Sequence, residues 1–85
     1  MESLDSSHNN LSEVDDKLLA KAVVRIKTVS MSSTRLTTVQ FTTLLQTILT
    51  EKELVMESLD IRANNLSKVD DQLLARAAEE STIRY

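Results

Sequence analysis

Glycine, proline and cysteine are all absent from this sequence of 85 residues. The lack of cysteine excludes a disulfide framework and a thiolate metal site. At average usage, glycine and proline together would number about ten in a chain of this length. Turns that require a positive φ must therefore use other residues. We expect asparagine, aspartate or serine there, each at some energetic cost.

Aromatic residues and charge clusters are also scarce. Phe41 and Tyr85 are the only aromatic residues, which leaves little with which to build a small-molecule pocket or a binding hot spot. The net charge is −3 with mixed signs and no block of Lys or Arg, so we expect no nucleic-acid partner. Apolar runs are too short for a membrane span, and Met1-Glu2-Ser3 does not resemble a signal peptide. We therefore expect no membrane association, and a cytoplasmic location if the protein is natural.

A segment of 23 residues occurs twice. The stretches 1–23 and 56–78 align without gaps and are identical at sixteen positions. Both follow the pattern L-x-x-L-x-L-x-x-N-x-L, and a weaker third version begins at Ile26 with Thr34 in the Asn position. A fixed repeat of this kind indicates stacked supersecondary units.

In this pattern the chain resembles the leucine-rich repeat family, in its helical, ribonuclease-inhibitor-like form. The resemblance implies an α/β fold: a truncated solenoid of three strand–helix units, about 1–25, 26–55 and 56–85, within a single domain. It also implies an asparagine ladder through Asn9 and Asn64, with Thr34 as a weak substitute. The family binds proteins through solvent-facing strand positions, which here are Asp5, Ser7 and His8, then Ser30, Ser32 and Ser33, then Asp60, Arg62 and Ala63.

Local signals place the elements. An apolar stripe of Val14, Leu18, Ala22 and Ile26 predicts an inward helix face. Leu73 is the equivalent of Leu18 in the second copy and is also predicted to face inward. Ser12, Thr37 and Ser67 are the expected N-caps, and Thr37 with Gln40 has the form of a capping box. Strands are predicted near 28–31 and 58–62. The first copy should be degraded as a strand because Ser6 occupies an apolar position, and residues 81–85 carry little signal.

An all-α chain is the alternative fold. Nothing in the sequence forbids helices over about 12–29, 38–59 and 67–82, which would form a dimeric helical bundle. Alternating β-branched residues such as Val29 favour the solenoid instead.

No motif indicates catalysis, a cofactor or a metal. His8 has Asp5, Ser6 and Ser7 beside it, but adjacent residues on one short segment do not form a catalytic triad. The acidic pairs 15–16 and 70–71 are explained as first-turn helix residues that favour the helix dipole. Asn10-Leu11-Ser12 and Asn65-Leu66-Ser67 match the N-glycosylation pattern, but without a secretion signal we expect no modification.

Two functions remain. The composition favours an engineered or evolved repeat-derived scaffold that folds and self-associates, without catalytic activity. The alternative is a natural interaction module that binds a protein partner on its strand face. Because the terminal units lack capping repeats and would expose apolar side chains, we expect a homo-oligomer, a two-fold dimer with domain swapping as one form.

Overall fold

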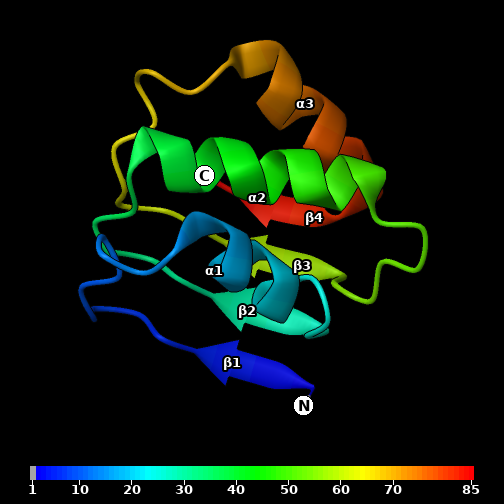
Figure 1. Cartoon of the computed structure of the whole chain (residues 1–85), viewed down its shortest axis with the longest axis horizontal. Coiled ribbons are helices and arrows are strands. Elements are labelled where there is room, and N and C mark those ends of the chain that lie inside the picture. The colour runs from blue at the N-terminus through cyan, green and yellow to red at the C-terminus, as the bar shows by residue number, and fades with distance from the viewer. Residues whose placement is uncertain (1) are drawn as a thin grey trace.

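The structure, a computed structural model, describes residues 2–85 and contains an α/β fold with strands and helices in strict alternation (Figure 1). The chain begins with a strand and ends with one, and a helix lies between each pair of strands. In chain order the elements are β1 (Ser3–Asp5), α1 (Asp16–Val23), β2 (Thr28–Ser30), α2 (Thr38–Thr50), β3 (Ser58–Asp60), α3 (Asp71–Glu80) and β4 (Thr82–Arg84).

The four strands form one parallel sheet in the order β1-β2-β3-β4. The register is regular, because the middle residues Leu4, Val29, Leu59 and Ile83 stand side by side across the sheet. Neighbours in the sheet are therefore also neighbours in sequence. The predicted α/β class is confirmed, with a fourth strand that the sequence did not indicate.

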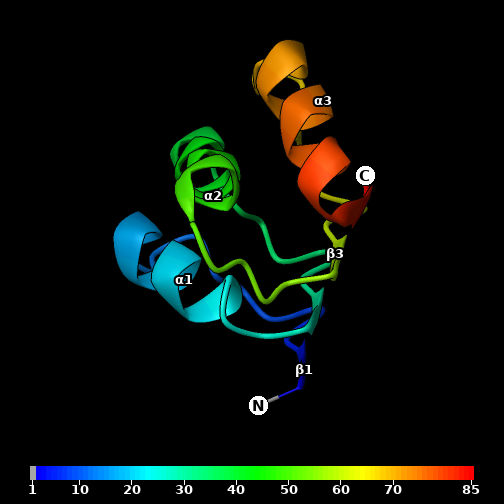
Figure 2. The same cartoon turned by 90° about the vertical axis from the view of Figure 1, so that its right-hand side faces the viewer.

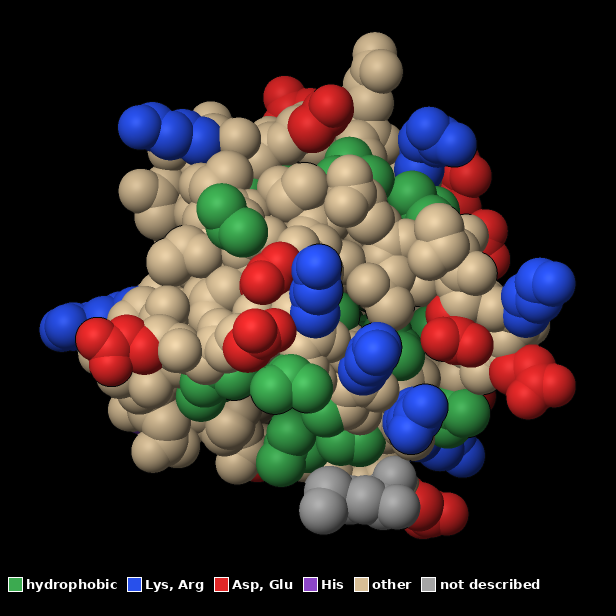
Figure 3. All heavy atoms as spheres, in the orientation of Figure 1, with side chains coloured by type: hydrophobic (Ala, Val, Ile, Leu, Met, Phe, Trp, Pro, Cys, Tyr) green, Lys and Arg blue, Asp and Glu red, His purple; other side chains and the backbone are tan. Residues whose placement is uncertain are grey.

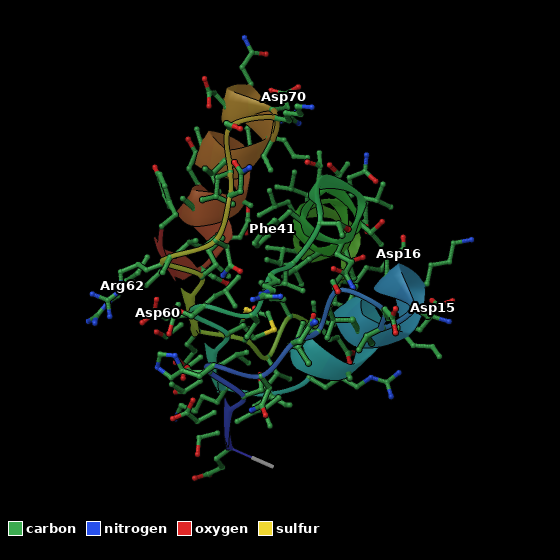
Figure 4. The ribbon with its side chains drawn as sticks, turned by 90° about the vertical axis from the view of Figure 1, so that its left-hand side faces the viewer. Asp15, Asp16, Phe41, Asp60, Arg62 and Asp70 are labelled. Carbon is green, nitrogen blue, oxygen red and sulfur yellow. The ribbon has the colours of Figure 1, made fainter. Side chains whose placement is uncertain are left out.

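The three helices lie on one side of the sheet and leave the other side uncovered (Figure 2). Because side chains alternate along a strand, the middle residue of each strand points toward the helices and its neighbours point away. Helix α2 lies between α1 and α3 and contributes more buried hydrophobic residues than either of them: Phe41, Leu44, Leu45 and Ile48. Phe41 fills the space between α2 and the sheet (Figure 4).

The first and third helices begin later than predicted. Their N-caps are Asp15 and Asp70, not Ser12 and Ser67. The Asp15 carboxylate accepts the backbone N–H of Lys17 at 2.9 Å, and Asp70 does the same for Gln72 at 2.8 Å. A charged acceptor satisfies the free N–H groups of a helix start and also favours the positive end of the helix dipole, so the aspartates prevail over the serines.

The two serines instead close a turn before each helix. Ser12 donates its backbone N–H and its hydroxyl to Asn10 Oδ1, at 3.0 and 2.7 Å. Ser67 makes the same pair of bonds to Asn65, at 3.1 and 2.7 Å. Of the three expected helix starts, only that of α2 forms as predicted, with a capping box between Thr37 and Gln40.

The all-α alternative is wrong. Helix α1 ends at Val23, and α2 ends at Thr50, where Glu51 turns to extended backbone. The predicted extensions of these helices are turns and irregular backbone that lead into β2 and β3, and each of these strands has a neighbour on both sides. The expected loss of the first strand is also wrong. Ser6, in its apolar position, is half-buried and donates its hydroxyl to the Ser30 carbonyl at 3.4 Å.

The glycine-free turns use residues other than those expected. Positive φ angles occur at His8 (67°), Ser33 (56°), Arg35 (58°) and Ala63 (60°), and only Ser33 is of an expected type. His8, Ser33 and Ala63 each stand three residues after the last residue of a strand. The repeated backbone therefore imposes the left-handed conformation on whichever residue occupies this position, at a cost of about 1–2 kcal/mol each.

Two amide side chains, of the half-buried Asn64 and the buried Gln40, tie consecutive segments together. Asn64 Oδ1 accepts the backbone N–H groups of Thr34 at 3.1 Å and Leu36 at 3.3 Å, and its Nδ2 donates to the Met31 carbonyl at 2.9 Å. In the same way Gln40 Nε2 donates to the carbonyls of Leu11 and Val14, at 2.7 and 2.8 Å. Each amide thus satisfies backbone groups of a turn about thirty residues earlier in the chain.

Candidate interaction surfaces

The uncovered side of the sheet is polar along its whole width. Here we call it the open face, and it is formed by the outward residues of the strands and by those that directly follow them. In the register of the sheet, Asp5, Ser30, Asp60 and Arg84 form one row across it. The resemblance to leucine-rich repeats predicted nine residues on one surface: Asp5, Ser7, His8, Ser30, Ser32, Ser33, Asp60, Arg62 and Ala63. In the structure they lie on the strands and on the turns that directly follow them.

Three serines form a cluster on this face. Ser7 and Ser30 place their hydroxyl oxygens 2.7 Å apart, and Ser32 donates its hydroxyl to Ser7 at 3.1 Å. These bonds join segments that are 23 and 25 residues apart in sequence, so they depend on the sheet register. A hydroxyl can both donate and accept, so the cluster can exchange its internal bonds for bonds to a partner.

Asp60, which stands beside Ser30 in the sheet, forms an ion pair with Arg62 (Figure 4). The guanidinium donates Nε to Oδ1 at 3.0 Å and Nη2 to Oδ2 at 2.8 Å, a bidentate arrangement. The hydrogen bonds from Arg62 lower the pKa of Asp60 below its usual value, and the charges of Arg62 and Arg84 add to this effect. The same carboxylate raises the pKa of Arg62.

Asp5 holds the equivalent place in β1 but has no such cation. Its carboxylate accepts the backbone N–H of Ser7 at 3.0 Å. Hydrogen bonds from Ser7 lower the pKa of Asp5, and the nearby His8 contributes a smaller effect in the same direction. The open face therefore carries two carboxylates that stay ionised to low pH, together with the two arginines near Asp60.

Beyond the strand ends, the turns surround an open depression of about 610 Å³. Its wall includes the three left-handed residues that follow the strands. The lining residues are His8, Ser33, Arg35, Leu36, Ala63, Asn64 and Asn65. His8, Ser33 and Ala63 were among the predicted surface positions. Sequence reasoning missed Arg35 and Asn65 because their place depends on the turn conformation, and it missed Arg84 because β4 itself carried little signal.

The two copies of the repeated helix bury opposite sides. In α1, Ala20 is buried and Ala22 is exposed, whereas the equivalent residues of α3, Ala75 and Ala77, are exposed and buried respectively. The reason is that α2 lies between them, so α1 packs against it with one side and α3 with the other. The repeated helix segment can therefore pack against α2 with either of its two sides.

This arrangement leaves an exposed apolar strip on α1 and the turn before it, which we call the α1 outer face: Val14, Leu18 and Ala22. The predicted inward position of Leu18 is wrong, because this residue is 67% exposed. Val14 is 40% exposed, whereas the equivalent Val69 belongs to the core and is only 6% exposed. Leu73, the equivalent of Leu18, is half-buried.

The surface over the helices has a different character. Basic and acidic side chains are interspersed there, and hydrophobic side chains show as several separate areas between them (Figure 3). The acidic pairs at 15–16 and 70–71 lie at the starts of α1 and α3, away from the open face (Figure 4). Within residues 2–85 no three His, Asp or Glu side chains are grouped closely enough to hold a metal ion. None of the helices there is both long and apolar enough to cross a membrane.

No protein-family model matches this chain, and neither a curated protein nor a solved structure does.

Proposed function

We propose that this chain is a short stack of leucine-rich-repeat-like strand–helix units that acts as a non-catalytic scaffold and associates with further copies of itself. The resemblance in the L-x-x-L-x-L-x-x-N-x-L pattern is supported by the in-register parallel strands. It is also supported by Asn64, whose side chain bonds to the backbone of the preceding turn as an asparagine ladder requires. Thr34, in the Asn position before it, is completely buried and donates its hydroxyl to the Met31 carbonyl at 2.7 Å.

The observation that carries self-association is the difference between Val14 and Val69. These are equivalent residues of the repeated segment, and Val69 belongs to the buried core whereas Val14 is exposed. Val14 and Leu18 have the same side chains as their equivalents Val69 and Leu73, but both are exposed. Burying apolar surface contributes about 25 cal/mol per Å², so covering the α1 outer face is favourable.

Strand edges at both ends of the sheet support the same proposal. β1 and β4 each pair on one side only. An unpaired edge presents free N–H and C=O groups to another strand. The β1 edge lies at the same end of the molecule as the α1 outer face, so one partner copy can pair with the strand and cover the helix together (Figure 1).

Light scattering coupled to size-exclusion chromatography across a dilution series tests this function. The chain has a mass of 9.5 kDa, and we expect a larger species that dissociates on dilution. Leu18→Lys should shift the equilibrium toward the single chain without loss of folding, because Leu18 is exposed. Gln46→Lys is the matched control: it adds the same charge at an exposed position of α2 and should leave association unchanged.

Three results would contradict the proposal in different ways. A folded species of 9.5 kDa at all concentrations would exclude self-association. An oligomer that tolerates Leu18→Lys would place the interface elsewhere. An equal effect of both lysine variants would indicate a general charge effect, because only one of them lies on the α1 outer face.

A second function, binding of a polypeptide partner through the open face, is favoured by a separate observation. The serine cluster and the Asp60–Arg62 pair leave hydroxyls and charges accessible on a side of the sheet that no helix covers. Peptides selected from a display library against the chain test it. We expect binding to be lost with Ser32→Arg and retained with Gln46→Lys. Peptides that respond to Gln46→Lys alone would place binding on the helices and contradict this function.

A further inference from the structure

The depression at the strand ends has the dimensions of a small-ligand site. Its volume of about 610 Å³ is within the range of about 300–1,000 Å³ that such sites occupy. Polar and apolar groups meet in it: Asn64 and Asn65 contribute amides, and Leu36 and Ala63 contribute aliphatic carbon. It lies beyond the strand ends, so it is separate from the α1 outer face on which self-association depends.

All four non-glycine residues with positive φ in the stretch 2–85 line this depression. Three of them, His8, Ser33 and Ala63, share one position in the repeated backbone. Arg35 is different, because its equivalents in the other two units are Asn10 and Asn65, neither of which has a positive φ. Strained backbone of this kind is concentrated at binding sites, where it directs a side chain or an N–H group toward a ligand.

Arg35 also lacks the local role that its equivalents have. Asn10 and Asn65 accept hydrogen bonds from Ser12 and Ser67 through Oδ1 and so close their turns. An arginine has no acceptor and cannot make this bond. Its guanidinium takes part in neither of the two salt bridges of residues 2–85, so its five donors are available at the wall of the depression.

The charges around Arg35 favour an anion. The lining contains Arg35 and His8 but no Asp or Glu. On the open face, Asp60 is held by Arg62 in a bidentate pair, and Asp5 accepts the backbone N–H of Ser7. Asn65 uses its Oδ1 for Ser67, which leaves its Nδ2 as a further donor.

A carboxylate fits these groups better than a phosphate. The planar guanidinium matches the two oxygens of a carboxylate in a bidentate pair. A single arginine in a chain of net charge −3 compensates one negative charge rather than two. The aliphatic carbon of Leu36 and Ala63 suits a ligand that carries its carboxylate on a short hydrocarbon group.

From these observations we infer that the depression binds a carboxylate borne on a short aliphatic group, with Arg35 as its principal contact. Such a group occurs at the C-terminal residue of a polypeptide and in a glutamate side chain. The site does not depend on self-association, and it extends the open face with a ligand of defined chemistry.

Amide chemical shifts in a nuclear magnetic resonance titration test the inference. The probes are N-acetyl-leucine, its uncharged amide, N-acetyl-glutamic acid α-amide and inorganic phosphate. We expect one or both carboxylic acids to shift the amides of Arg35, Leu36 and Asn65 with a dissociation constant in the millimolar range. The first acid represents a C-terminus and the second a side chain, so their comparison identifies the source. Equal shifts with the uncharged amide, or shifts with phosphate alone, would overturn the inference.

Two variants separate the loss of this guanidinium from a general loss of positive charge. Arg35→Gly removes the guanidinium and at the same time suits the φ of 58°, so the fold should be kept while binding weakens about tenfold or more. Arg76→Gln removes a guanidinium from an exposed position of α3 outside the depression, and its affinity should stay within about twofold of the parent. Retained affinity in folded Arg35→Gly would show that Arg35 is not the contact and overturn the inference.

Discussion

Asn64 supplies the acceptor for the backbone N–H of Thr34, 3.1 Å away, although thirty residues separate them in sequence. Thr34 is completely buried, so its N–H has no access to water. Asn64 also accepts from Leu36 and donates to the Met31 carbonyl. One side chain thus satisfies three backbone groups of another turn.

Asn64→Ala should therefore destabilise the fold strongly. Buried N–H and C=O groups left without partners cost about 1–3 kcal/mol each, and we expect a total loss of about 3 kcal/mol in the free energy of unfolding. Urea titration followed by circular dichroism measures it. Asn9→Ala is the matched control, because Asn9 is exposed and bonds only to the carbonyls of its own turn. Equal losses in the two variants would refute a tie between units through Asn64.

Gln40→Ala tests the corresponding tie between α2 and the first turn. It removes both donors to the carbonyls of Leu11 and Val14 and the acceptor for Thr37, so we expect a loss of about 2–3 kcal/mol. Gln46→Ala, on the exposed side of the same helix, should change stability by less than about 0.5 kcal/mol. Thermal melting compares the two, and a similar midpoint for both variants would contradict the assigned role of Gln40.

Leu18 and Leu74 should differ sharply when each is replaced by Ala. Leu18 is exposed in the single chain, and its truncation should cost less than about 0.5 kcal/mol when measured under conditions of dissociation. Leu74 is buried against the core, and its loss should cost about 2–4 kcal/mol. Comparable losses in the free energy of unfolding for the two variants at low protein concentration would mean that α1 buries the side that carries Leu18.

Ala63→Gly should stabilise the protein. The left-handed φ of 60° strains a residue with a Cβ but not glycine, and after the greater chain entropy of glycine is subtracted we expect a gain of about 0.5–1 kcal/mol. Ala75→Gly, in the exposed side of α3, provides the reference for glycine in regular helix and should lose about 1 kcal/mol. Denaturant midpoints with unchanged slope measure both, and a loss at position 63 would be incompatible with the left-handed turn.

The carboxyl of Asp60 should respond to its arginine. Because its folded pKa is lowered, the stabilisation is present above the unfolded value of 3.8 and is lost as the pH falls through the folded value. Arg62→Gln should move the pKa of Asp60 up toward 3.8 and leave that of Asp5 unchanged, since Ser7 provides its main hydrogen bonds. Carbon chemical shifts of the two carboxyl groups across an acid titration provide the measurement, and an unmoved Asp60 would rule out Arg62 as the cause.

Local patterns in the sequence predicted the elements whose causes are local. Thr37 and Gln40 lie within one helical turn, and their capping box forms as expected. β2 and β3 follow from short alternating segments. In contrast, the buried side of α1 depends on which neighbour it meets, and the sequence around Leu18 is apolar on more than one side. β4 carries no such alternating signal and is a strand through its pairing with the edge of β3.

The open face was partly predictable for the same reason. Asp60 and Arg62 are two residues apart and lie on one side of an extended segment, so their proximity follows from the sequence. The bond between Ser7 and Ser30 requires the register of β1 against β2, which no local pattern specifies. The left-handed turn at Arg35 is likewise hidden, because arginine is not a residue that marks positive φ.

Because α1 and α3 have the same Leu and Ala residues at equivalent positions but bury opposite sides, each copy already contains the residues for a neighbour on either flank. A further unit of the α2 type added before α1 would meet Val14 and Leu18, whose counterparts Val69 and Leu73 already belong to the core or pack against it. Lengthening the molecule therefore requires only that an existing segment be copied, with no new side chain designed for the junction. A chain lengthened in this way would cover the α1 outer face with apolar side chains that the sequence already contains.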